Sequence, residues 1–135
     1  MPARKRIGPF VRVLEEGLLE MAFDAEMTDA LLEEHIEAFG GFCERNRSPM
    51  ALVVLAGSML RISARQRRRL AEFEKRFEDH DRRYGVGVAL VASNTIVRGL
   101  ITAVFWLKPP VYPHRFFADR DEALAWLRER LASGA

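Results

Sequence analysis

The sequence has few residues of the types that build disulfides and metal sites. Among its 135 residues are one cysteine, Cys43, and three histidines. A single thiol excludes an internal disulfide and is typical of a reducing compartment. His35 follows two glutamates but lacks a second histidine one turn away, and neither His80 nor His114 has an obvious acidic partner. We therefore expect no metal site, and we interpret Cys43 as a small hydrophobic residue of a helix stripe.

Long apolar runs and a strong net charge are also missing. The most apolar stretch, Ile96–Leu107, contains Arg98 and is shorter than the roughly 20 residues that a membrane span needs. The basic segment Met1–Phe10 is not followed by the apolar run of a secretory signal. The net charge of +2 argues against a nucleic-acid-binding domain. These absences predict a cytoplasmic protein with no integral membrane segment and no nucleic-acid partner.

Catalytic motifs are absent as well. The chain has no glycine-rich phosphate loop, no Gly-x-Ser-x-Gly turn and no zinc-ligand spacing. We expect a protein without enzymatic activity, cofactor or metal. An enzyme whose catalytic residues are scattered along the chain stays open as an alternative.

The hydrophobic pattern predicts a single α/β domain over residues 1–135, with a flexible basic N-terminus at 1–7. Two short strands around Gly17 form a hairpin, and strands then alternate with helices in the order ββαβαβαβα. This order predicts one mixed, mostly parallel sheet of five strands, with helices on both faces. The expected strands are Pro9–Leu14, Leu18–Phe23, Met50–Leu55, Val86–Ala92 and Tyr112–Phe117.

Capping residues mark where the helices begin. Thr28 or Asp29 opens the first helix, and a Ser63–Gln66 capping box opens a second that runs to about Arg83. Ser93, Asn94 and Thr95 offer caps for the third helix, which Pro109-Pro110 ends. An Asp119–Glu122 cap opens the last helix, whose apolar stripe is Leu124, Leu127 and Leu131.

The second half of the chain resembles the SpoIIAA-like branch of the STAS domains (sulfate-transporter and anti-sigma-factor-antagonist), which are related to the lipid-binding CRAL-TRIO fold. The segments that carry the resemblance are Gly87–Val91, Arg98–Val104, Tyr112–Phe117 and Asp121–Leu127. The resemblance implies the same order of elements, and a role in binding or regulation.

One loop departs from that family. Members that are switched by phosphorylation carry Asp-Ser-(Ser/Thr)-Gly before the helix that follows the third strand. Here Ala56–Ser63 keeps Ser58 and Ser63 but has neither the acidic residue nor the trailing glycine. The resemblance therefore does not extend to a phosphoserine switch.

Two helix N-termini at the carboxyl edge of the sheet form a candidate anion site. Helix N-termini attract anions through free N–H groups and the helix dipole, and ligands of parallel sheets sit beyond this edge. Arginines crowd the first N-terminus, where they oppose the dipole. A solvated basic face is the alternative explanation. The candidate ligand-binding residues are Ser58, Arg61, Ser63, Arg65, Ser93, Asn94 and Thr95.

The helix Thr95–Leu107 is apolar around more of its surface than one sheet contact requires. The surplus, chiefly Phe105, Trp106 and Leu107, is a candidate partner interface. A homodimer seam, a partner groove and the wall of an apolar pocket stay open, as does simple coverage by the loop at 109–112.

Two functions follow. The first is a STAS-like regulatory or protein-interaction domain, acting as a homodimer or with a regulatory protein partner. The alternative is a carrier or binding module for a small amphipathic anion or lipid. An apolar cavity lined by Phe105 and Trp106 beneath arginines would favour the carrier.

Overall fold

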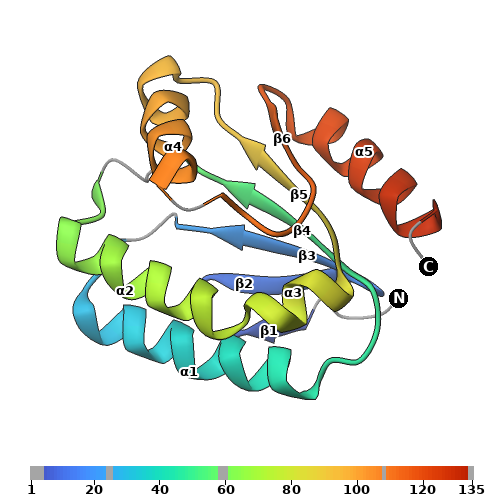
Figure 1. The fold of residues 1–135 in the computed structure, drawn as a ribbon, viewed down its shortest axis with the longest axis horizontal. Helices are drawn as coiled ribbons and strands as arrows, with labels where there is room; N and C mark the ends of the chain where they lie inside the picture. The colour runs from blue at the N-terminus through green and yellow to red at the C-terminus, as the bar shows by residue number, and fades with distance from the viewer. Residues whose placement is uncertain (1–4, 24–25, 58–60, 108, 134–135) are drawn as a thin grey trace.

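The computed structural model describes residues 5–23, 26–57, 61–107 and 109–133 (Figure 1). Strands and helices alternate along most of these ranges. In chain order they are β1 (Arg6–Ile7), β2 (Val11–Glu15), β3 (Leu18–Ala22), α1 (Asp29–Arg45), β4 (Met50–Leu55), α2 (Ala64–Arg76), α3 (Glu78–Tyr84), β5 (Gly85–Val91), α4 (Thr95–Leu107), β6 (His114–Phe117) and α5 (Arg120–Ser133).

The strands lie side by side in their chain order, from β1 to β6. Neighbours are antiparallel from β1 to β3 and parallel from β3 to β6. The predicted α/β class with one mixed sheet is confirmed, but the predicted count of five strands is wrong, because the described residues form a sheet of six. The additional strand is β1, where Ile7 pairs with Val11 and is buried. A strand of two residues is too short for a periodic pattern to reveal it.

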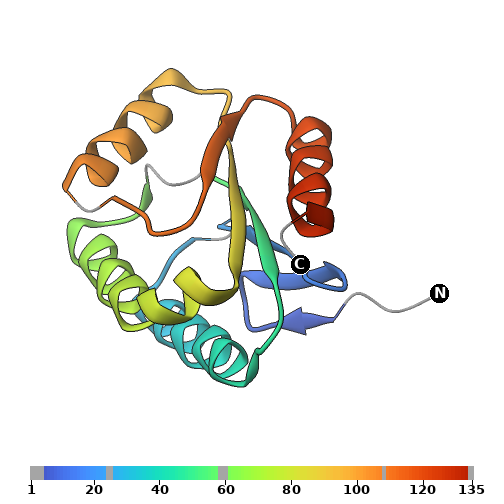
Figure 2. The same cartoon turned by 45° about the vertical axis from the view of Figure 1, so that its right-hand side comes forward.

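The strand order explains why the helices divide unequally between the two faces. Each crossover from β3 to β6 moves one strand in the same direction, and right-handed crossovers then place their helices on one face. Figure 2 shows α1, α2 and α4 on one side of the sheet and α5 on the other. Along β4, Met50 belongs to the core beneath α1 and α2 and Val54 to that beneath α4, while Ala51 and Val53 pack under α5.

The caps predicted for two helices are confirmed. Thr28 accepts a hydrogen bond from the N–H of Leu31, and Ser63 and Gln66 form both halves of a capping box. The single helix expected up to Arg83 is instead two, α2 and α3, separated by Phe77 with φ −103° and ψ 16°. Phe73 and Phe77 keep their four-residue spacing across this break, so the apolar periodicity hides it.

Aromatic rings fill the core between α1, α2 and the hairpin. Phe39 stacks on Phe73 with 5.7 Å between ring centroids, and Phe73 lies 4.9 Å from Phe77. Gly40 of α1 faces these rings: an added Cβ would lie 3.4 Å from Phe73 and 3.5 Å from Phe77. These are ordinary van der Waals distances, so an alanine at this position would contact the rings without displacing α2.

Candidate ligand cavity

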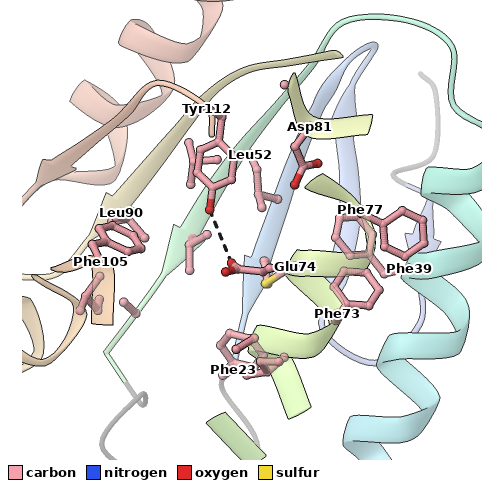
Figure 3. Close-up of a pocket in the computed structure, with 18 of the residues that line it drawn as sticks. Phe23, Phe39, Leu52, Phe73, Glu74, Phe77, Asp81, Leu90, Phe105 and Tyr112 are labelled. Carbon is pink, nitrogen blue, oxygen red and sulfur yellow. Dashed lines mark hydrogen bonds between the residues drawn. The ribbon is translucent and has the colours of Figure 1, made fainter. Parts of the chain in front are cut away.

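A cavity of about 210 Å³ lies between the sheet and the helices of its larger layer. The sheet contributes apolar side chains such as Leu52 and Leu90, α2 contributes Phe73, and α4 contributes Phe105. Figure 3 shows these rings and aliphatic groups pointing toward one space from opposite sides. The cavity exists because α2 packs against α1, whereas α4 rests on the sheet through Val97 and Ile101.

His35 of α1 is the most unusual residue of the lining. It is only 1 % exposed, and neither of its ring nitrogens has a hydrogen-bond partner within the described part of the chain. The rings of Phe10 and Phe39 lie 5.5 and 5.7 Å away. Burial lowers the pKa of His35 to about 4, so the ring is neutral, with one donor and one acceptor nitrogen. Leaving a buried hydrogen bond unmade costs about 1–3 kcal/mol. The imidazole of His35 carries this cost, because it has no hydrogen-bond partner among the described residues.

The rim of the cavity is polar. The Tyr112 hydroxyl donates to Glu74 Oε1 at 3.5 Å, and Figure 3 shows this contact spanning the space, with Asp81 nearby. Burial raises the pKa of Tyr112, and the negative charges of Glu74 and Asp81 raise it further, so the phenol remains a donor. Glu74 and Leu100 are exposed residues of the lining, so the cavity reaches the surface between α2 and α4.

The residues predicted for an anion site at α2 have local roles. Ser63 caps the helix through the N–H of Gln66, and Arg65 lies 3.8 Å from Asp29 of α1. Arg61 is exposed. Ser58 lies outside the described residues.

Further along α2, Arg69 pairs with Glu33 at 2.8 Å, and Arg76 pairs with Glu44. These arginines of α2 therefore form ion pairs with glutamates of α1 at the surface. Such pairs favour the alternative explanation, a solvated basic face, over an anion site.

The second predicted group lies at the start of α4. Asn94 Oδ1 accepts from the N–H of Ile96 at 2.8 Å, and Ser93 and Thr95 are exposed. In Figures 1 and 2 the N-termini of α2 and α4 lie apart, at different corners of the helix layer. The residues proposed as one anion site thus occupy two separate helix starts.

The predicted interface residues of α4 separate as well. Phe105 is half-buried, lines the cavity and meets the His114 ring edge-on at 4.8 Å. Trp106 is 82 % exposed and takes no part in the cavity. The side chain of Leu107 lies outside what the structure describes.

Sequence reasoning missed the cavity and the role of His35. The cavity is assembled from β3 to β5, α1 to α4 and the loop before β6, and no local pattern joins those segments. The available signal was the excess of phenylalanine on the predicted apolar stripes, with His35 one turn from Phe39.

Two other kinds of site have no counterpart among the described residues. No cluster of three or more histidine, cysteine, aspartate or glutamate side chains is placed to hold a metal ion. No helix in the same ranges combines the length and apolar character that crossing a membrane demands.

Comparison with protein-family models, curated proteins and solved structures finds no match to this chain. The resemblance to STAS domains therefore rests on the sequence pattern alone.

Proposed function

We propose that this protein binds a small, largely apolar ligand with one neutral polar group in the cavity beneath α4. The observation that carries the proposal is His35, buried in the lining with no hydrogen-bond partner among the described residues for either ring nitrogen. A ligand hydroxyl or carbonyl that hydrogen-bonds this ring would remove the cost of its burial, and such an interaction favours the loaded state.

The size of the cavity limits the ligand. An engineered apolar cavity of about 150 Å³ holds benzene. A cavity of about 210 Å³ therefore accommodates one aromatic ring with a short substituent, or a short acyl chain. A long-chain lipid is too large for the enclosed part, so we propose a smaller ligand than a membrane lipid.

The rim favours a neutral polar group over an anion. Glu74 and Asp81 both line the cavity and bring negative charge, while Arg67 is the cation of the lining. Arg67 already donates to the carbonyl of Ile62 at 2.6 Å. A phenol, a short-chain alcohol or a ketone meets these conditions better than a carboxylate does.

The direct test is a titration of the protein with phenol and with a short-chain alcohol, followed by methyl NMR or calorimetry. We expect saturable binding, weakened at least tenfold in Leu52→Phe, whose added ring carbons fill the cavity. Leu124→Met is the matched control, because Leu124 is buried under α5 on the opposite face. Absence of saturable binding to the unmodified protein, or equal weakening by both substitutions, would contradict the proposal.

A second candidate function, association with another protein, is favoured by the outer face of α4. The described large hydrophobic residues that are exposed are Ile96, Leu100 and Trp106, and all three belong to this helix. Gly99 and Ala103 lie exposed between them at helical spacing. This strip carries no charge, so the same strip on a second copy of the chain is a suitable apolar partner. The resemblance to STAS domains also implies protein interaction. We therefore propose a second copy of the chain as the partner.

A further inference from the structure

A second hollow, of about 420 Å³, lies at the sheet edge beside the start of α5. Its lining includes residues that follow the carboxyl ends of two parallel strands, Phe23 after β3 and Gly57 after β4. Its described lining also includes three arginines, Arg6, Arg12 and Arg120, but a single carboxylate, Glu20. The hollow is therefore basic, in contrast to the rim of the cavity beneath α4.

The sheet register builds this cluster. Arg6 of β1 pairs with Arg12 of β2, and Arg12 pairs with Glu20 of β3, so the three residues form one row across neighbouring strands. Side chains in such a row project from the same face. Arg120, the first residue of α5, reaches the same row from above the sheet.

Glu20 holds two of the arginines by separate oxygens. Oε1 accepts from Arg12 Nε at 2.8 Å and lies 2.7 Å from its Nη2. Oε2 accepts from Arg120 Nε at 2.8 Å and lies 2.6 Å from its Nη2. The Glu20 side chain is only 5 % exposed, whereas those of Arg12 and Arg120 are 37 % and 36 % exposed. The buried carboxylate thus fixes two guanidinium groups that remain open to solvent.

These guanidinium groups keep unused donors. Each has five N–H bonds, and the contacts with Glu20 occupy only its Nε and Nη2 edge. Within the described ranges, neither Arg12 Nη1 nor Arg120 Nη1 has a hydrogen-bond partner. Neutralising Glu20 needs one arginine, so the pair retains one positive charge, to which Arg6 adds another.

We propose that this hollow binds a phosphate group, with Arg12, Arg120 and Arg6 as the contacting residues and Glu20 as the positioning residue. The planar fork of arginine matches phosphate oxygens, and two forks held at fixed angles lose little entropy on binding. Ligands of open α/β sheets also sit beyond the carboxyl ends of strands. The hollow is larger than a free phosphate ion, so it also has room for a small organic phosphate ester.

Among the described residues, the carboxylates at the start of α5 do not oppose an anion here. Asp119 Oδ1 accepts from the N–H of Asp121 and caps α5, and neither residue lines the hollow. Among the described lining residues, the hollow shares Phe23 with the cavity beneath α4, but its arginines take no part in that cavity, so phosphate binding does not depend on the apolar ligand.

The test is a calorimetric titration with inorganic phosphate and with phenyl phosphate. We expect saturable binding that weakens at least tenfold in Arg120→Gln and in Arg6→Gln. Among the described residues, the Arg6 side chain bonds the carbonyl of Pro9 and takes no part in the Glu20 pairs, so we expect its substitution to leave those pairs and the fold in place. Phenyl phosphate binding tighter than inorganic phosphate identifies an organic ester, and equal affinities identify free phosphate.

Arg128→Gln is the matched control. It changes the net charge by the same amount on the same helix, but Arg128 pairs with Glu15 outside the hollow. Affinity should be unchanged in this variant. Absence of saturable binding by the unmodified protein, or equal weakening in Arg128→Gln, would overturn the proposal.

Discussion

Arg120 Nε donates a hydrogen bond of 2.8 Å to Glu20 Oε2, although 100 residues separate the two in the sequence. The contact ties the start of α5 to β3. Removing one partner of a buried ion pair leaves the other uncompensated, which costs about 3–5 kcal/mol when both are fully buried. Arg120 is about one-third exposed and Glu20 keeps Arg12, so solvent screening reduces the cost.

We therefore expect Arg120→Met to lower the free energy of unfolding by about 1–2 kcal/mol in urea denaturation. Arg128→Met removes an exposed pair with Glu15 and should stay within about 0.5 kcal/mol of the unmodified protein. Equal losses in the two variants would show that burial of Glu20 does not matter.

The same pair predicts a pH dependence. Burial raises the pKa of Glu20, but hydrogen bonds and positive charge from Arg120 and Arg12 lower it more, so the net shift is below 4.5. A lowered carboxylate pKa stabilises the fold fully above the unfolded value and loses that effect as pH falls through the folded value. Urea midpoints measured at falling pH should therefore decline below 4.5 more steeply in the unmodified protein than in Glu20→Gln. Parallel curves would exclude this contribution.

His35 makes stability depend on pH in a higher pH range than Glu20 does. Its pKa falls from 6.5 to about 4 because burial disfavours the charged ring. The unfolded chain therefore takes up a proton that the folded one refuses, and stability should drop by about 3 kcal/mol as pH falls from 6.5 to 4. In His35→Phe this part of the decline should disappear, and stability at neutral pH should rise by about 1–3 kcal/mol because the unpaired nitrogens are gone.

Ligand binding separates two explanations of His35. If the ring serves the cavity, His35→Phe gains stability and loses affinity for phenol. A gain in stability with unchanged affinity would assign His35 to the core alone.

Replacing glycine by alanine should change stability in opposite directions at Gly85 and Gly99. A Cβ at Gly85 would lie 2.6 Å from the carbonyl oxygen of Asp81, whereas one at Gly99 meets nothing within 4 Å. We expect Gly85→Ala to cost about 1–3 kcal/mol, because the α3–β5 junction must move. Gly99→Ala should gain about 0.5–1 kcal/mol, since alanine restricts the unfolded chain and favours a helix. Thermal or urea unfolding of both variants checks the sign of each change.

Trp106 tests self-association. If the outer strip of α4 joins two copies, Trp106→Glu should convert a dimer to a monomer in sedimentation velocity and leave the fold intact. Arg68→Glu, an exposed change on α2, should leave the oligomeric state as it is. If the unmodified protein stays monomeric at high concentration, the second candidate function, self-association through α4, is contradicted.

The fold was largely predictable because its signals are local. Two helix starts are predicted by capping residues that act within a single turn, namely Thr28, Ser63 and Gln66. Met50–Leu55 is apolar without alternation because both faces of β4 are covered. Two strand boundaries differ from the prediction: the strand expected from Tyr112 begins at His114, and that expected from Pro9 begins at Val11.

The sites were much less predictable. The sequence shows where helix N-termini lie along the chain, and on that basis it predicts an anion site there. It does not show how far apart two such N-termini lie in space. The Arg12–Glu20–Arg120 cluster depends on register and on a helix that arrives 100 residues later, which no local pattern encodes. The wide apolar surface expected for α4 divides in the structure: Phe105 lines the cavity and Trp106 is exposed, and its role as a partner interface stays a prediction.

Among the described helices, α5 alone covers the second face of the sheet (Figure 2). It packs over Leu18, Val53 and Ala89, and its first residue, Arg120, pairs with Glu20. Without α5 these apolar side chains would be exposed, and Glu20 would keep Arg12 but not Arg120 as its ion-pair partner. A variant truncated before Arg120 would thus present an apolar sheet face to water, and we expect it to aggregate or to bind chaperones.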